Sequence, residues 1–200
     1  MKKKFNSLEE EIHHELSKYS VKTEEIKNEK GWSYLNVSVF LDGEQIGEYI
    51  RNYPSLSDTF YPFKKDGKGY ALYSKHYTAT GVMKLPSCEE VCSEELISSG
   101  FCPVEYYVPY DLEEGLVGQI GFVAGCVWGD DSSWKIQVLD LSNIENGVIL
   151  RDDRFRYIEL PQEVKLKNAI STWHYDKEDD IIEIGATKKF KLWSGKEIKS

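Results

Sequence analysis

The segment around His76 carries the densest set of side chains that could do chemistry. Tyr73, Lys75, His76 and Tyr77 lie close together in the sequence. An imidazole titrates near neutral pH, so beside an ammonium group and phenols it suits hydrogen-bonded recognition of a ligand or acid–base catalysis. The same residues are also compatible with an ordinary exposed loop.

A second polar and aromatic segment contains Arg51 and Tyr53, directly before Pro54. Proline restrains the backbone, and tyrosine offers an amphipathic contact area with few rotamers to lose. We predict that the two segments form an exposed recognition edge. The candidate binding residues are Arg51, Tyr53, Tyr73, Lys75, His76 and Tyr77.

Aromatic residues are abundant, with 13 Tyr, 8 Phe and 5 Trp, and they crowd into proline-containing segments. Recognition surfaces use such residues as anchors, but strands also favour them as fillers of sheet faces. Both interpretations stay open at this point. The two crowded groups are Tyr49, Tyr53, Phe60, Tyr61, Phe63 and Tyr70 near Pro54 and Pro62, and Tyr106, Tyr107 and Tyr110 around Pro109.

Four cysteines, Cys88, Cys92, Cys102 and Cys126, admit two interpretations. They could complete a tetrahedral zinc site, but their spacing is not that of a zinc knuckle, and cysteine is among the most buried residue types without any function. We predict free thiols packed in the core, no metal and no cofactor.

Motifs of known enzyme classes are missing from the sequence. It has no G-x-S-x-G elbow, no P-loop and no dinucleotide fingerprint. Asp152, Asp153 and the Glu163 to Lys165 segment follow loosely the acidic order of many nucleases, but Arg151 and Arg154 bracket the aspartates and would pair with them. These features favour a non-enzymatic protein, although a catalytic triad can also be assembled from distant residues.

An N-terminal helix and a series of strands must position these residues. Leu8, Ile12, Leu16 and Tyr19 fall on one helical face, which predicts an amphipathic helix over residues 7–28. Residues 34–41 alternate before Asp42-Gly43, which predicts a hairpin, and residues 70–73 with 80–85 form a second candidate pair.

Two further elements interrupt or complete the β-series. Ser87 and Glu90 form a capping box, which predicts a short inserted helix through Ile97. The segment from Leu116 to Trp128 has few charges, which predicts a central strand covered on both faces. Further strands are predicted at residues 156–160, 167–173, 180–185 and 188–193.

The C-terminal segment Trp173-His174-Tyr175-Asp176, continuing through Ile181–Gly185 to Phe190–Trp193, resembles one blade of a WD-repeat propeller. Residues 136–141 have a sequence similar to that of the last strand of this segment. The two similar stretches are 54 residues apart, whereas WD repeats recur every roughly 40–45 residues. We therefore predict stacked, partly propeller-like hairpins and do not assign the family.

The predicted fold class is mainly β. It comprises an antiparallel meander or sandwich-like or barrel-like sheets, an amphipathic N-terminal helix and one short inserted helix. Residues 1–30 are predicted as a helical segment on or next to the domain, and residues 31–200 as a single β-rich domain.

Composition limits the partners and the compartment. The formal net charge is −9, so nucleic acid is a poor candidate. No apolar run is long enough to span a membrane, and Met1-Lys2-Lys3-Lys4 precedes acidic residues and not a signal core. We expect a soluble, acidic, cytoplasmic protein.

Two hypotheses of function follow. The first is a non-enzymatic binding protein of the inhibitor, immunity or adaptor type, which recognises a protein or a small ligand through tyrosine-rich loops. The second is a small enzyme acting on a polar or phosphorylated substrate in a pocket containing Arg51, Lys75 and His76. A homo-oligomer formed through the N-terminal helix is a third expectation.

Overall fold

The fold is described from a computed structural model of the chain. The structure describes residues 8–52, 60–76, 78–93, 101–110, 118–127, 130–147, 150–152, 158–160, 174–176, 181–184 and 188–191. It is mainly β and antiparallel, as predicted, with one short N-terminal helix and a 3-10 turn. Within these ranges the sheets neither close into a barrel nor form a propeller. No helix there has the length and apolar character needed to cross a bilayer.

The first sheet is a meander of three strands in the order β1-β2-β3. The strands are β1 (Tyr19–Lys27), β2 (Ser33–Leu41) and β3 (Glu44–Asn52). Asp42 and Gly43 both have positive φ, 50° and 87°, which is the backbone of a primed hairpin turn. The predicted hairpin at these residues is confirmed.

The second sheet has the order β4-β5-β6-β7. Its strands are β4 (Phe60–Lys65), β5 (Lys68–His76), β6 (Ala79–Leu85) and β7 (Glu90–Ser93). Tyr70 to Tyr73 pair with Lys84 to Gly81, so the second predicted hairpin is also confirmed.

The third sheet has the order β11-β10-β9-β8, with β12 also paired to β10. A 3-10 turn, η1 (Ile144–Asn146), follows β10. Strand β9 lies between two neighbours and its residues 120–125 are buried, so the predicted central strand is confirmed. The bounds are β8 (Phe101–Tyr107), β9 (Ile120–Val127), β10 (Asp130–Asp140), β11 (Leu150–Asp152) and β12 (Ile158–Leu160).

The C-terminal region contributes a smaller antiparallel meander, β13-β14-β15. The predicted strands at 156–160, 180–185 and 188–193 correspond to β12, β14 and β15, while residues 167–173 lie outside the described ranges. The bounds are β13 (His174–Asp176), β14 (Ile181–Ile184) and β15 (Lys188–Lys191).

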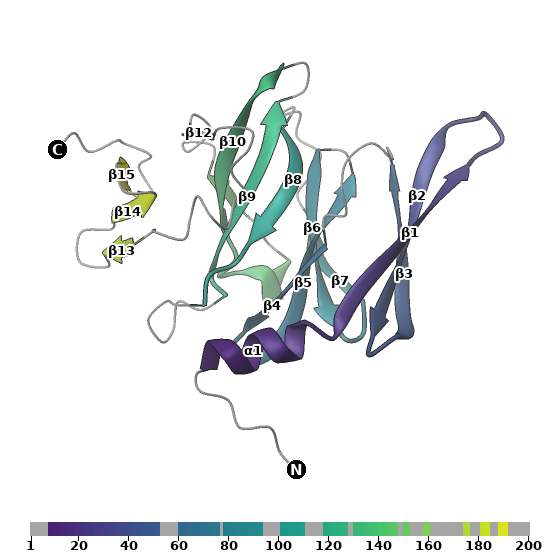
Figure 1. Cartoon of the computed structure of the whole chain (residues 1–200), viewed down its shortest axis with the longest axis horizontal. Helices are drawn as coiled ribbons and strands as arrows, with labels where there is room; N and C mark the ends of the chain where they lie inside the picture. The colour runs from purple at the N-terminus through teal and green to yellow at the C-terminus, as the bar shows by residue number, and fades with distance from the viewer. Residues whose placement is uncertain are drawn as a thin grey trace, which may run out of the picture.

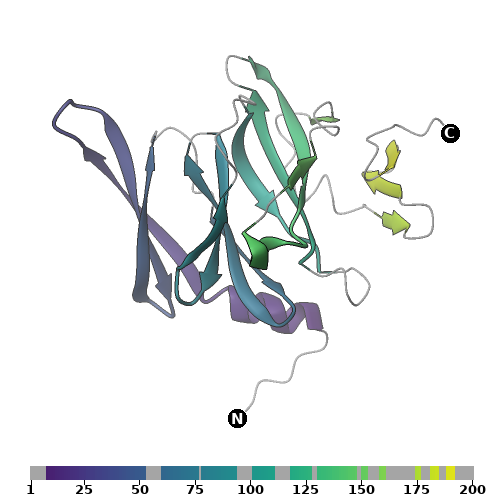
Figure 2. The same ribbon diagram turned by 180° about the vertical axis from the view of Figure 1, so that it is seen from behind.

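The second sheet is the middle layer, because both of its faces are buried (Figures 1 and 2). Alternate residues of β5 point to opposite faces. Tyr70 and Leu72 join a core with the third sheet and helix α1 (Leu8–Leu16). Ala71 and Tyr73 join a second core, against which Tyr19, Tyr49, Phe60 and Cys88 pack.

The helix predicted over residues 7–28 is wrong beyond Leu16. Ile12 and Leu16 are buried as the helical pattern predicts, but residues 19–27 form β1. Residues 19–27 pair with β2 along the whole strand, and this tertiary pairing overrides the local helical periodicity. The segment 1–30 is therefore only partly helical, and the proposed domain division stays a prediction.

The helix predicted from Ser87 to Ile97 is contradicted at residues 90–93, which form β7. The Ser87 hydroxyl accepts a hydrogen bond from the Glu89 N–H at 3.4 Å, within a turn in which Cys88 N–H donates to the Lys84 carbonyl at 2.9 Å. This local side-chain bond completes a turn between strands and not a helix cap. Residues 94–97 lie outside the described ranges.

Candidate functional site

The predicted binding residues are only partly brought together. Arg51 lies on β3 and Tyr73 on β5, and their exposed fractions are 2% and 3%. This burial contradicts the expectation that they lie on an exposed edge. Lys75 and His76 are half-buried at the end of β5, and Tyr53 and Tyr77 lie outside the described residues.

A carboxylate that the sequence did not identify joins two of these residues. The Tyr73 hydroxyl donates to Oε2 of Glu90 on β7, and the Lys75 ammonium donates to Oε1 of the same group at 2.6 Å. The Tyr73 ring reaches Glu90 across Gly81, where β6 carries no side chain. We refer to Tyr73, Lys75, His76 and Glu90 as the Glu90 cluster.

Charge and burial set the ionisation of the Glu90 cluster. Burial opposes ionisation of Glu90, but the hydrogen bonds from Lys75 and Tyr73 outweigh it and lower the carboxyl pKa. Burial and then the Lys75 ammonium lower the pKa of His76, against the opposing effect of Glu90. Burial and the bond to Glu90 raise the pKa of Tyr73, so the phenol stays protonated.

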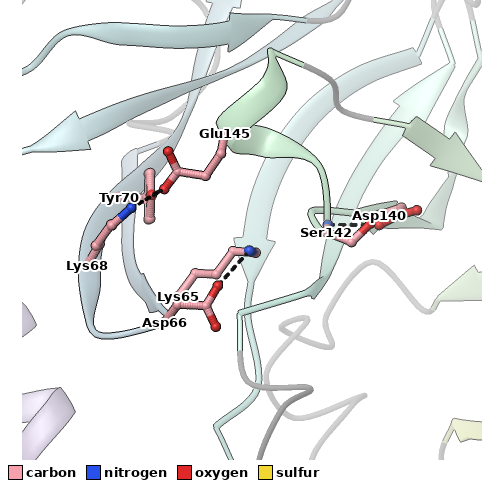
Figure 3. A network of polar contacts seen from close by, with 7 residues as sticks. All are labelled: Lys65, Asp66, Lys68, Tyr70, Asp140, Ser142 and Glu145. Atoms are coloured by element: carbon pink, nitrogen blue, oxygen red, sulfur yellow. Dashed lines mark hydrogen bonds and ion pairs between the residues drawn. The ribbon is translucent and has the colours of Figure 1, made fainter.

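A second carboxylate, Glu145 of η1, makes a matching set of contacts (Figure 3). It accepts hydrogen bonds from the Tyr70 hydroxyl and from the Lys68 ammonium, the latter at 3.0 Å. We refer to these three residues as the Glu145 cluster. The Asp140 carboxylate accepts the Ser142 N–H at 2.8 Å just before η1, which fixes the chain entering the turn.

A cavity of about 460 Å³ lies between α1, β4 and β8. We name it the tyrosine cavity, because five of its lining residues are tyrosines that come from separate segments. Its lining is His13, Leu16, Ser17, Tyr19, Phe60, Tyr61, Pro62, Val104, Glu105, Tyr106, Tyr107 and Tyr110.

Ring contacts and hydrogen bonds hold the walls of the tyrosine cavity in place. The Tyr61 and Tyr107 rings meet edge to face with centroids 6.4 Å apart, and the rings of His13 and Tyr110 do so at 5.8 Å. The Tyr110 hydroxyl accepts the Lys64 N–H at 3.0 Å, which ties the segment after β8 to β4.

The position of β4 explains how a proline can line this cavity. Pro62 has no N–H to donate, and β4 is an edge strand whose partner is β5 on one side only. A proline at an edge costs no ladder hydrogen bond if its nitrogen faces outward.

The phenols of Tyr61 and Tyr110 remain neutral at physiological pH, because the pKa of each is raised. Burial raises the pKa of Tyr61 to about 12, although a backbone hydrogen bond with Val108 opposes it. Burial also raises the pKa of Tyr110. Tyr106 is buried, and its hydroxyl lies 2.9 Å from the Thr80 hydroxyl. The cavity therefore offers apolar ring faces with fixed hydroxyls, and Glu105 adds a carboxylate.

A second cavity, of about 360 Å³, is lined by residues of the junction between α1 and β1 and of the two hairpin turns near Asp42 and Gly67. Leu16 and Tyr19 line both cavities. Neither cavity is lined by Arg51, Lys75 or His76, so the pocket expected to gather these three residues does not correspond to either one.

Cys88 and Cys92 lie on opposite sides of the middle sheet. Cys92 belongs to the core shared with the third sheet, whereas Cys88 packs against the opposite core. Burial raises the pKa of Cys92 to about 12, which keeps the thiol protonated and unreactive. Among the residues that the structure describes, no three side chains of His, Cys, Asp or Glu gather in a way that could hold a metal ion.

Comparison with protein-family models finds no match to the chain, and comparison with curated proteins finds none either. Sequence reasoning identified the two tyrosine groups but not their convergence at one cavity. It also missed Glu90 and Glu145 as partners of β5, and no local pattern marks either residue.

Proposed function

We propose that this chain is a binding protein that takes up an aromatic or aliphatic side chain of a partner protein in the tyrosine cavity. The observation that carries the proposal is the convergence of tyrosines from β1, β4, β8 and the segment after β8 on one cavity. The proposal keeps the expected class of inhibitor, immunity or adaptor protein and moves the contact surface away from the Arg51 to Tyr77 edge.

The size and chemistry of the cavity support this choice. A volume of about 460 Å³ lies within the roughly 300–1,000 Å³ typical of ligand sites. Tyr61 and Tyr107 contact each other, so little rotamer entropy is left to lose when a ligand packs on them. A ring or branched chain would gain contact with their faces, and the Tyr hydroxyls and Glu105 would orient the adjoining backbone.

The enzyme hypothesis receives less support from the geometry. Catalysis on a polar substrate needs a concave site with the acting groups directed into it. Lys75 already donates to Glu90, and Arg51 is buried on a different sheet. The surroundings of these residues favour a structural polar cluster over a substrate pocket.

The test is a titration of the ¹⁵N-labelled chain with N-acetyl-phenylalaninamide, using N-acetyl-glycinamide as the control ligand. We expect amide cross-peaks of α1, β4 and β8 to shift with the first ligand at millimolar concentration, on the order of 1–10 mM. Tyr107→Ala should reduce the shifts at least about fivefold. Tyr34→Ala, at the opposite end of the first sheet from Tyr19, should leave them unchanged.

Two outcomes would overturn the proposal. One is a set of shifts confined to residues that do not line the cavity, and the other is equal binding by the wild type and Tyr107→Ala. If Tyr107→Ala loses its folded amide dispersion, Val104→Trp replaces it, since a large side chain at this lining position fills the cavity while keeping the tyrosines.

A further inference from the structure

Strand β1 is a long edge strand with one described neighbour. It spans nine residues, pairs with β2 along all of them, and forms one end of the sheet order β1-β2-β3. Most of its residues are exposed. In both overall views the tip of the β1-β2 hairpin extends away from the other sheets (Figures 1 and 2). An edge of this length is a template for pairing with another chain.

The hydrogen bonds flanking β1 fix which of its backbone groups face outward. Just outside the strand, the Asp42 N–H donates to the Lys18 carbonyl, and the Asn28 N–H donates to the Trp32 carbonyl, both at 3.0 Å. The register between β1 and β2 has no shift, so even-numbered residues bond to β2. The N–H and C=O groups of the odd-numbered residues, from Tyr19 to Lys27, therefore point away from β2.

A second copy of β1 can pair with this edge only if odd-numbered residues face odd-numbered residues. A two-fold axis through Thr23 satisfies this condition along the whole strand. It places Lys22 of each copy opposite Glu24 of the other, on the face that also carries Phe40, over which the Lys22 ammonium lies at 4.8 Å. Because both copies contain Lys22 and Glu24, this arrangement gives two symmetric ion pairs.

Neighbouring registers lack this complementarity. Moving the axis to Lys22 places two ammonium groups opposite each other, and moving it to Glu24 places two carboxylates opposite each other. Like charges directly across a strand pair are destabilising. The charge pattern of β1 therefore favours the register centred on Thr23 over its two neighbours.

We infer that β1 is a homodimer interface, in which two copies join their first sheets into one continuous antiparallel sheet of six strands. The sequence led us to expect an oligomer formed through an N-terminal helix. The dimer inferred here uses the N-terminal segment in its observed conformation, as a strand, and does not depend on the tyrosine cavity as a binding site.

Sedimentation equilibrium of the full chain and of its charge-swap variants tests the interface. The wild type should approach twice the chain mass of 23.1 kDa. Lys22→Glu and Glu24→Lys should each weaken dimerisation at least about tenfold, because two attractive pairs become repulsive. The double variant Lys22→Glu/Glu24→Lys recreates the pairs with their signs exchanged and should restore the dimer.

Thr23→Pro provides an independent variant. It removes an outward N–H at the axis and no hydrogen bond to β2, so it should give a folded monomer. A wild type that sediments at the chain mass at its highest soluble concentration would overturn the inference. So would single swaps without effect, or a double swap that stays monomeric while its circular dichroism matches that of the wild type. Pairing of β1 with a different protein would appear as one of these results.

Discussion

Strand β5 contributes to two clusters, one on each face of the middle sheet, that share three residue types: tyrosine, lysine and glutamate. On one face, Tyr70 and Lys68 donate to Glu145. On the other, Tyr73 and Lys75 donate to Glu90. In each cluster a phenol and an ammonium two residues away hold one carboxylate, and in each the carboxyl pKa is lowered.

The two clusters differ in what they connect. Glu145 belongs to η1, which follows the third sheet, so the Glu145 cluster fastens one sheet to another. Glu90 belongs to β7, in the same sheet as Tyr73 and Lys75. The Glu90 cluster also contacts the first sheet, because the ring of Tyr49 lies 4.7 Å from that of Tyr73.

The two clusters show that the residue types in a cluster do not by themselves define its function. A tyrosine, a lysine and a glutamate in contact serve as a connector in the Glu145 cluster, so the same trio around Glu90 is not by itself a sign of catalysis. What distinguishes the Glu90 cluster is His76, whose pKa is lowered and which has no counterpart among the three residues of the Glu145 cluster. Variants that disturb one cluster and leave the other in place test this difference.

The largest effect is expected from Gly81→Ala. A Cβ at this position would lie 2.6 Å from Cε1 and Cζ of the buried Tyr73 ring, so the ring must move and its bond to Glu90 must break. We expect the free energy of unfolding in urea to fall by about 2 kcal/mol.

Gly69→Ala is the matched control for Gly81→Ala on the same sheet. Its added Cβ would lie 3.2 Å from Cβ of Leu85, a milder contact. A loss of stability in Gly69→Ala equal to that in Gly81→Ala would show that the tight approach of Tyr73 to β6 has no special role.

An intermediate effect is expected from Tyr73→Phe, which keeps the ring and removes the donor to Glu90. The bond to a charged acceptor should contribute about 1–2 kcal/mol to the free energy of unfolding. In a double-mutant cycle, Tyr73→Phe and Glu90→Gln should be coupled by more than about 0.5 kcal/mol, because their side chains are in contact.

The opposite faces of β5 supply the control for this cycle. Tyr73→Phe and Tyr70→Phe belong to different clusters, so their effects on the urea unfolding free energy should add within about 0.5 kcal/mol. Strong coupling between the two tyrosines would mean that the clusters act as one unit through β5.

The sequence predicted those features that depend on neighbouring residues. The Asp42-Gly43 pair predicted a hairpin turn, and the uncharged run around Gly121 predicted a strand with neighbours on both sides. The same local logic failed at residues 19–27, where long-range pairing with β2 overrides a helical pattern. It also failed at Glu90, which was assigned to a helix because Ser87 lies three residues before it.

The candidate site depended on contacts that no local pattern encodes. The tyrosines at 61 and 107 were both noted as parts of aromatic groups, yet only the packing of β4 near β8 brings their rings together. Burial of Arg51 was missed for a similar reason, since an arginine is rarely expected between two sheets.

The smallest effect is expected from the pH dependence of the Glu90 cluster. The pKa of His76 is lowered in the folded chain from its usual 6.5, first by burial and then by Lys75. The unfolded chain therefore binds a proton more readily, so stability is complete above pH 6.5 and declines as the pH falls toward the folded pKa.

The glutamates of both clusters have lowered pKa values, so their contribution is lost only below their ordinary value of 4.5. A comparison of urea midpoints at about pH 7.5 and about pH 5.5 thus separates the effect of histidine from that of these glutamates. The wild type should lose more stability over this interval than His76→Gln, in which the neutral side chain cannot take up a proton. Equal losses would assign the decline to other groups and remove the one feature by which the Glu90 cluster differs in charge chemistry from the Glu145 cluster.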